Sequence, residues 1–323
     1  MKIRCAVIGV GYLGRFHAQK LKSLPDVELV AICDIDKNQA NLVAKELGVE
    51  ACINYQDLIG KVDAVIIAST TISHFKIAEV CLMRGIHVLV EKPITETVAE
   101  ANTLIALAHK NKLKLQVGHL ERFNPARIAL EPYLANPLFI ESTRLAPFNP
   151  RGSDVNVILD LMIHDIDIIQ TLVKSPIMHI DAQGAPVISP SLDIANARIN
   201  FQNHCVANVT ASRVSYKTER KMRIFQYKSY ISIDFHQKKF AVFTKGNGEM
   251  FPGIPNIVQH EEQLPNNDAL LAEVKSFIDC IKQNTTPVVT GEEGRDALAT
   301  AHMITDLITH HHTAVYQEYE FEA

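Results

Sequence analysis

The first 120 residues alternate short apolar runs with longer stretches of helical spacing. The apolar runs are rich in β-branched residues, as buried strands are. We therefore predict strands at 3–8, 27–33, 62–68, 86–90 and 113–117, separated by helices near 13–24, 37–47, 73–84 and 97–111. Strands that alternate with helices indicate a parallel sheet covered on both faces and wound by right-handed crossovers. Residues 1–120 are thus expected to form an α/β Rossmann domain.

The pattern changes from residue 121. A strongly apolar helix is predicted at 156–173, and strand-like segments then follow one another without helices between them. These segments are 193–201, 205–213, 220–226, 229–235 and 239–244, the last closed by a turn at 245–248, and two helices follow near 268–283 and 292–309. Successive strands predict a mainly antiparallel sheet, so residues 121–323 are expected to form an α+β domain.

Composition narrows the class of protein. The chain has 323 residues, 47% of them hydrophobic and 21% charged, with a formal net charge of −4. It is too apolar for a disordered protein and has no general attraction for nucleic acid or anionic membrane. No run approaches the ~20 apolar residues of a membrane span, and the N-terminus resembles no signal peptide. Six cysteines without a CxxC pair suit a reducing compartment, so we expect a cytoplasmic protein. His310-His311-His312 has no second cluster at ligand spacing, and no metal site is expected.

A glycine motif, Gly9-Val10-Gly11-Tyr12-Leu13-Gly14, follows the first predicted strand and opens the first helix. In such a motif the first glycine permits a tight turn, the second lets the backbone approach a pyrophosphate, and the third allows close helix–strand packing. Asp34 follows 20 residues after Gly14, at the end of the second predicted strand. A carboxylate there accepts a hydrogen bond from the ribose 2′-hydroxyl and repels a 2′-phosphate. The motif predicts NAD as the cofactor, with NADP less favoured.

Ligands of open α/β sheets lie beyond the carboxyl ends of the strands, so residues at several strand ends should line one crevice. The expected cofactor-binding residues are Gly9, Gly11, Tyr12, Leu13, Gly14, Asp34, Ser69, Thr70, His74, Glu91 and Lys92. Lys92 places an amine where the nicotinamide should lie. Pro93 biases its backbone toward an extended conformation.

Three motifs together resemble the glucose–fructose oxidoreductase/inositol dehydrogenase (Gfo/Idh/MocA) family. They are the glycine loop at 9–14, Glu91-Lys92-Pro93 and Asp160-x-x-x-His164, and the segment 116–125 is similar to the family's join between domains. The resemblance implies a Rossmann domain, a second domain with a large open sheet, a pyridine nucleotide, and reversible oxidation of a sugar or polyol hydroxyl. It also implies a cis Lys92–Pro93 bond. The chain departs from the family at Asn156-Val157, where relatives often have a glycine pair.

The apolar helix at 156–173 carries the candidate base. Asp160, His164, Asp167 and Thr171 follow helical spacing and would form one polar stripe. The alternative is a solvated face with an ordinary Asp–His pair. Together with the cofactor loop, the stripe predicts His164 as the base that takes the hydroxyl proton. Lys92 would hold the same oxygen, and Asp160 would orient the substrate or the imidazole.

The substrate class follows from two weaker signals. Basic residues gather at Arg213, Lys217, Arg220, Lys221, Arg223 and Lys228. They could bind a phosphorylated substrate, or form a solvated face or a subunit contact. Segments 118–125 and 159–165 resemble the family branch that oxidises UDP-N-acetylglucosamine at its 3-hydroxyl. We expect a UDP-sugar, or alternatively a free sugar or inositol. The expected substrate-binding residues are Lys92, Arg122, Asn124, Asp160, His164 and Arg213.

Two other classes of function stay open. A nucleotide-binding regulator would keep the fold without turnover, although it would have no need of a base such as His164. A thiol-dependent aldehyde dehydrogenase would need a cysteine at the nicotinamide, and Cys205 lies in an apolar strand. Glu273 is expected to be structural rather than catalytic. A wide sheet usually buries one face against another copy, so a homodimer or homotetramer is expected.

Overall fold

The computed structural model describes residues 2–149 and 155–320, which form two compact units. The first comprises Met1–Phe123 and Asp268–Leu298, and the second Asn124–Asn267 and Ala299–Ala323. The predicted division at residue 120 lies close to Phe123, where the first segment of the first unit ends. It differs in assigning residues 268–298 to the second domain, whereas these residues pack with the first unit.

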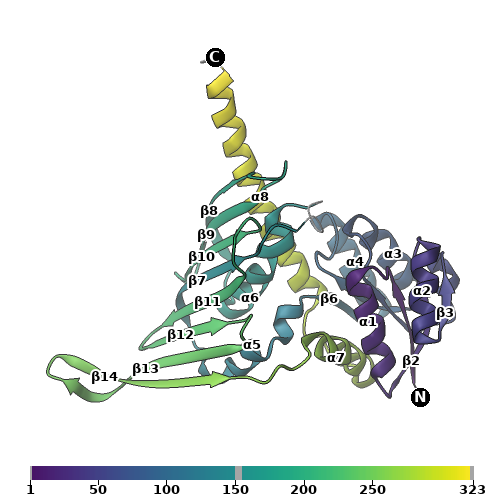
Figure 1. The fold of residues 1–323 in the computed structure, drawn as a ribbon, viewed down its shortest axis with the longest axis horizontal. Helices are drawn as coiled ribbons and strands as arrows, with labels where there is room; N and C mark the ends of the chain where they lie inside the picture. The colour runs from purple at the N-terminus through teal and green to yellow at the C-terminus, as the bar shows by residue number, and fades with distance from the viewer. Residues whose placement is uncertain (1, 150–154, 321–323) are drawn as a thin grey trace. The chain divides into compact units, whose positions relative to one another are not determined.

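A six-stranded sheet with the order β3-β2-β1-β4-β5-β6 forms the centre of the first unit (Figure 1). The strands are β1 (Ile3–Ile8), β2 (Val27–Cys33), β3 (Glu50–Cys52), β4 (Ala64–Ile67), β5 (His87–Glu91) and β6 (Leu115–Gly118). The helices are α1 (Tyr12–Ser23), α2 (Lys37–Leu47), α3 (Thr71–Met83) and α4 (Val98–Asn111), with 3₁₀ turns η1 (Tyr55–Leu58) and η2 (Leu120–Phe123). Every strand pair is parallel, so the predicted Rossmann fold is confirmed. Of its strands the sequence missed β3, whose three residues are too few for a periodic signal.

The helix α7 (Ala269–Gln283), late in the chain, also belongs to this unit. Val274, Phe277 and Ile278 are spaced along one helix face and join the buried cluster that contains Val7 and Leu21. Asp268 caps α7 by accepting a hydrogen bond from Leu271 N, and it also pairs with Lys20 of α1 at 2.7 Å. These apolar contacts explain why a segment so late in the chain belongs to the N-terminal unit.

The second unit is built on an eight-stranded sheet with the order β14-β13-β12-β11-β7-β10-β9-β8. Its strands are β7 (Pro137–Leu145), β8 (Ile177–Ala185), β9 (Ile194–Phe201), β10 (Val206–Ser212), β11 (Glu219–Gln226), β12 (Ser229–Asp234), β13 (Lys239–Phe251) and β14 (Ile254–Gln263). Only β7 and β10 pair in parallel among these strands, so the predicted mainly antiparallel sheet is confirmed.

The strands β7, β8 and β14 were not predicted, and the turn predicted at residues 245–248 is wrong. Those residues lie within β13, which pairs with β14 as a long hairpin that extends past the other strands (Figure 1). The side chains of β14 are almost all exposed. A strand with so little buried surface leaves no apolar alternation in the sequence, because only its backbone is paired.

The helix predicted at 156–173 consists of two segments. A π-helical turn, η4 (Ile158–Met162), leads into α6 (Ile163–Val173). The Asn156 side chain caps the start by accepting hydrogen bonds from Ile158 N and Leu159 N at 3.1 and 3.0 Å. The remaining elements are α5 (Pro125–Ala129), η3 (Glu131–Tyr133) and α8 (Gly291–Glu320). Over the described ranges, the helices fall short of the length or apolarity that a bilayer crossing requires.

Candidate active site

The glycine loop has the geometry of a pyrophosphate cradle. Gly9 has φ +82°, and a Cβ there would lie 2.5 Å from Ser69 N. A Cβ on Gly14 would lie 1.9 Å from Gly9 O, so neither position accepts a larger residue. A Cβ on Gly11 would meet nothing within 4 Å. Gly11 is also the N-cap of α1. The open space beside it therefore lies at the helix N-terminus, whose N–H groups can bind an anion. The residues present therefore fit a dinucleotide.

Asp34 follows β2 and is held by the loop itself. One carboxylate oxygen accepts from Val10 N at 2.7 Å, and the other accepts from Asp36 N at 2.9 Å. A carboxylate has about four lone-pair positions, so two remain for a ribose hydroxyl. The half-buried side chain thus lies beside the cradle in an orientation fixed by the protein's own backbone.

The end of β4 carries Ser69 and Thr70, of which Thr70 is exposed. His74, predicted as a cofactor contact, has a different environment. It is buried, with Nδ1 2.9 Å from Pro93 O and Nε2 3.0 Å from Ser69 O. Burial lowers the pKa of His74. Each ring nitrogen lies next to a backbone carbonyl, and the neutral ring can donate to one of the two. His74 therefore links the segments that follow β4 and β5.

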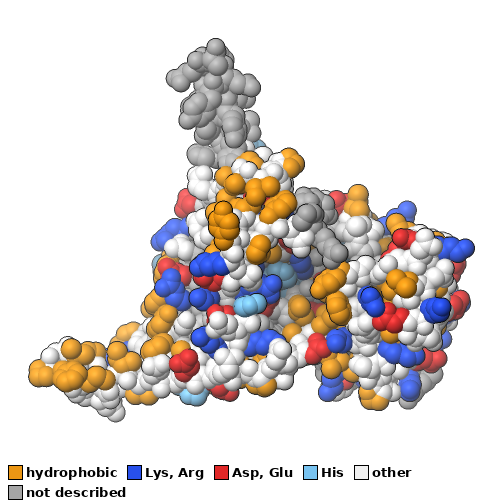
Figure 2. Space-filling view, in the orientation of Figure 1, with side chains coloured by type: hydrophobic (Ala, Val, Ile, Leu, Met, Phe, Trp, Pro, Cys, Tyr) orange, Lys and Arg blue, Asp and Glu red, His pale blue; other side chains and the backbone are white. Residues whose placement is uncertain are grey.

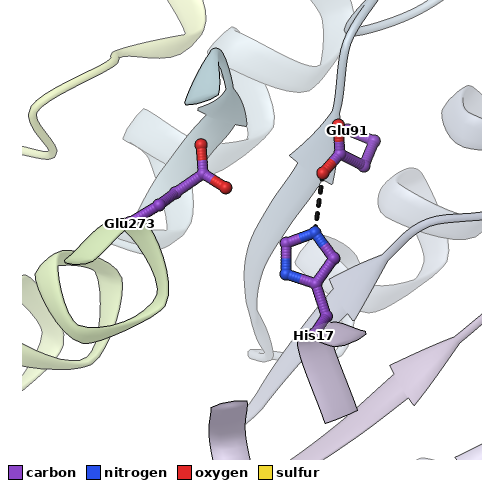
Figure 3. A group of neighbouring side chains, drawn as sticks. All are labelled: His17, Glu91 and Glu273. Carbon is purple, nitrogen blue, oxygen red and sulfur yellow. Dashed lines mark hydrogen bonds and ion pairs between the residues drawn. The ribbon is translucent and has the colours of Figure 1, made fainter. Parts of the chain in front are cut away.

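Lys92 follows β5, and the Lys92–Pro93 peptide bond is cis, as the resemblance implied. Its side chain is half-buried. Glu91, predicted as a cofactor contact, points into the protein instead. Its Oε1 lies 2.6 Å from Nε2 of His17, and its Oε2 accepts from Lys92 N at 3.3 Å (Figure 3). His17 was not predicted, because a lone histidine in a helix has no sequence signal.

The segment that resembles the family's domain join supplies structural contacts. Arg122 is 6% exposed and pairs with Glu293 at 2.5 Å. Asn124 caps α5 by accepting from Ala126 N and donates to Phe235 O, both at 3.1 Å. Burial, followed by the charges of Arg122 and Lys92, lowers the pKa of His119 to about 3. Arg122 and Asn124, two predicted substrate contacts, are therefore buried and bonded to other groups of the protein.

In the second unit, the candidate base is on α6. Asp160 and His164 are half-buried, with Asp160 in the π-helical turn, a feature frequent at functional sites. Asp165 forms a buried two-point ion pair with Arg144, with N–O distances of 2.7 and 3.1 Å, which fixes α6 against β7. Asp167 is only 2% exposed, so the predicted stripe is not a solvated face along its whole length.

Arg213, the last predicted substrate contact, is also buried. Its guanidinium donates to Asp193 at 2.8 Å and to the hydroxyl groups of Ser189 and Ser191 at 2.9 and 2.6 Å. Asp193 also accepts from three successive backbone N–H groups, those of Val187, Ile188 and Ser189. These contacts clamp the loop before β9. The predicted basic cluster is therefore divided, since Lys217 to Lys228 lie on the surface and Arg213 lies inside.

The fold and the cradle define an NAD-binding oxidoreductase with a separate α+β unit. Comparison with known sequences agrees over both units. Residues 3–119 match the description "Oxidoreductase family, NAD-binding Rossmann fold", and residues 142–232 match "GFO/IDH/MocA C-terminal domain". The chain belongs to the Gfo/Idh/MocA family, a family of NAD-dependent dehydrogenases that act on CH–OH groups.

Individual relatives refine this assignment. The chain is 38% identical over 300 residues to UDP-N-acetylglucosamine 3-dehydrogenase of Acidithiobacillus ferrooxidans, covering 93% of this chain and 95% of the relative. A solved structure of that enzyme superposes with a TM-score of 0.89 at 36% identity, over 95% of this chain and 98% of that one. The scyllo-inositol 2-dehydrogenase (NAD(+)) of Bacillus subtilis is 28% identical over 90% of this chain and 89% of its own length.

Proposed function

We propose that the protein is an NAD-dependent dehydrogenase that oxidises a secondary hydroxyl of a UDP-sugar, with the 3-hydroxyl of UDP-N-acetylglucosamine as the first candidate. The observation that carries this proposal is the 38% identity to a UDP-N-acetylglucosamine 3-dehydrogenase over 93% of the chain. Asp34 supports NAD over NADP, because its fixed carboxylate would repel a 2′-phosphate.

The chemistry needs three functions from this chain. NAD, when bound, supplies the hydride acceptor. His164 takes the hydroxyl proton, since an imidazole is suited to proton transfer at neutral pH. Lys92 donates to the same oxygen and stabilises the negative charge that develops there. Asp160 orients the sugar or the imidazole.

The test is NAD reduction across a panel of UDP-sugars, free hexoses and inositols, each also assayed with NADP. We expect turnover with UDP-N-acetylglucosamine and NAD, with kcat/KM at least about tenfold above every other pair. Faster turnover of an inositol would favour the second candidate, which the 28% identity to a scyllo-inositol 2-dehydrogenase supports. No turnover with any member of the panel would contradict an enzymatic role and favour a nucleotide-binding regulator.

We also propose a homodimer or homotetramer. Across the sheet of the second unit, Phe139, Phe225, Tyr230 and Phe243 form a row of aromatic rings with centroids 4.9–5.7 Å apart, and all four are only partly buried. At the tip of the β13–β14 hairpin, Met250, Phe251 and Ile254 are more than half exposed and form an apolar patch (Figure 2). Light scattering should give a mass at least twice 36.0 kDa, and a monomer at micromolar concentration would contradict this part.

A further inference from the structure

Three buried ionisable side chains of the first unit lie close together at the end of β5. They are His17 on α1, Glu91 at the end of β5 and Glu273 on α7 (Figure 3). One polar atom from each lies within 4.8 Å of the other two. His17 and Glu273 are fully buried, and Glu91 is 8% exposed. A cluster of two acids and an imidazole with almost no solvent requires a physical explanation.

The contacts in this cluster are unequal. Glu91 uses one oxygen for His17 and the other for the backbone N–H of Lys92. Over the described part of the chain, neither carboxyl oxygen of Glu273 has a hydrogen-bond partner, although its backbone carbonyl accepts from Gln116 at 3.3 Å. Figure 3 shows the Glu273 carboxyl directed toward the other two side chains. Gly118 makes room for Glu91, because a Cβ there would lie 2.9 Å from its carboxyl carbon.

The protonation state of Glu273 follows from its surroundings. Burial, and then the charge of Glu91, raise the pKa of Glu273 well above its usual value. The helices packed against α7 also carry Lys20 on α1 and Glu121 and Arg122 on η2. Lys20 pairs with Asp268, and Arg122 pairs with Glu293, so these two cations already have acid partners. The buried His119, which interacts with Glu91, has a pKa lowered to about 3, so its ring adds no positive charge at neutral pH. Burial and the neighbouring Glu91 carboxylate therefore favour the undissociated form of the Glu273 carboxyl group.

We propose that Glu273 is a positioning residue of the dehydrogenase proposed above, on which this inference rests. Its carboxylic acid provides one O–H donor, and the Glu91 carboxylate is the nearby anion that can accept from it. On this proposal, the O–H group of Glu273 and the ring of His17 together hold the Glu91 carboxylate. Because Glu91 also holds the backbone of Lys92, the cluster fixes the strand end that carries the catalytic amine.

A metal site is the competing explanation for the same three residues, and the geometry disfavours it. His17 Nε2 and Glu91 Oε1 are 2.6 Å apart, a hydrogen-bond distance. Two ligands of a tetrahedral zinc ion, each about 2.0–2.1 Å from the metal, lie about 3.3 Å apart. The distance between His17 and Glu91 thus fits a hydrogen bond and not a shared metal ion.

The first experiment measures thermal unfolding of the wild type and Glu273→Gln between pH 5 and 8. An acid with a raised pKa keeps its proton in the folded chain after the unfolded chain has lost it. Wild-type stability should therefore fall relative to Glu273→Gln as the pH rises above about 4.5, by roughly 3 °C in Tm per pH unit. The matched control is Glu28→Gln, an exposed residue of β2, whose Tm difference should stay constant. A Glu273→Gln variant that is less stable than the wild type at pH 8 would overturn the assignment, as would a stoichiometric bound metal that this variant lacks.

The second experiment separates positioning from packing. Glu273→Gln keeps a donor, so its kcat per folded enzyme should stay within about threefold of wild type. Glu273→Met keeps the size without a donor, and its kcat should fall about tenfold while KM for NAD changes less than threefold. The loss of activity at alkaline pH should begin at a lower pH in the wild type, where Glu273 ionises, than in Glu273→Gln. If the wild type is active and Glu273→Met has an unchanged kcat and pH profile, the positioning role is wrong. If the wild type turns over no substrate, the proposed function itself is wrong, while the Tm series still decides the state of Glu273.

Discussion

Three buried acids, two in the second unit and one in the first, have opposite kinds of partner. In the second unit, Asp165 and Asp193 each lie against an arginine. In the first unit, Glu273 lies beside another acid and an imidazole. Burial alone would raise the pKa of Asp193, but backbone N–H groups, Ser189 and Arg213 lower it below its usual value. Burial raises the pKa of Glu273. Neither side chain has exposed surface, yet the pKa is lowered in one and raised in the other, because their partners differ.

This difference corresponds to what each carboxyl group does. The paired acids hold separate segments together, with Asp165 fixing α6 to β7 and Asp193 clamping the loop before β9. Their charge is necessary, because each arginine would otherwise be buried without a counterion. Glu273 fixes another side chain, for which a single proton is sufficient.

The substitution Asp193→Asn is expected to have the largest effect, a loss of folding stability. Removing one member of a buried ion pair leaves the other charge uncompensated, so the free energy of unfolding at pH 7 should fall by about 3–5 kcal/mol. Because the folded pKa of Asp193 is depressed, the wild type keeps this stabilisation above pH ~4 and loses it as the pH falls below that value. The variant should lack that acid dependence in urea unfolding. The exposed pair Lys217–Glu219 provides the control, since Glu219→Gln should cost less than about 0.5 kcal/mol. A cost below about 1 kcal/mol for Asp193→Asn would break the comparison.

The next effect concerns catalysis, with one residue from each unit. His164→Asn should lower kcat on the order of 10²-fold, because proton transfer loses its base. Lys92→Met should lower kcat by a similar factor through lost stabilisation of the oxygen. Isothermal titration should show that NAD binding is unchanged in His164→Asn. Full activity in either variant would remove that residue from the proposed mechanism.

Sequence reasoning worked best where backbone constraints decide the residue type. Gly9 and Gly14 are required by contacts under 3 Å, and a requirement of that kind shows directly in the spacing of the glycine motif. It worked less well for polar side chains. Arg213 and Asn124 are of residue types that bind ligands, yet each is used inside the protein, and composition cannot distinguish the two roles. The cluster around Glu91 was missed because its three members come together only in the folded chain.

A smaller effect is expected at the cofactor acid. Asp34→Ala removes the acceptor for the ribose hydroxyl and also a contact to Val10 N, so KM for NAD should rise about tenfold, or about 1.4 kcal/mol. KM for NADP should fall, because the repulsion of its phosphate is lost. The ratio of kcat/KM for the two cofactors is the measurement. An unchanged ratio would show that Asp34 orders the glycine loop without selecting the cofactor.

The smallest effect concerns Asn156, at the start of the helix that carries Asp160 and His164. Asn156 accepts from two backbone N–H groups and donates to Thr305 at 3.3 Å, so its side chain does what a glycine cannot. Asn156→Ala should lower the free energy of unfolding by about 1 kcal/mol, as the loss of an N-cap does. Asn156→Asp retains the acceptor and should cost less, which makes it the matched control. If the cap also fixes the π-helical turn that carries Asp160, Asn156→Ala will raise KM for the sugar while KM for NAD stays constant. A loss of stability with both KM values unchanged would restrict Asn156 to capping and leave the orientation of Asp160 to the buried Arg144–Asp165 pair.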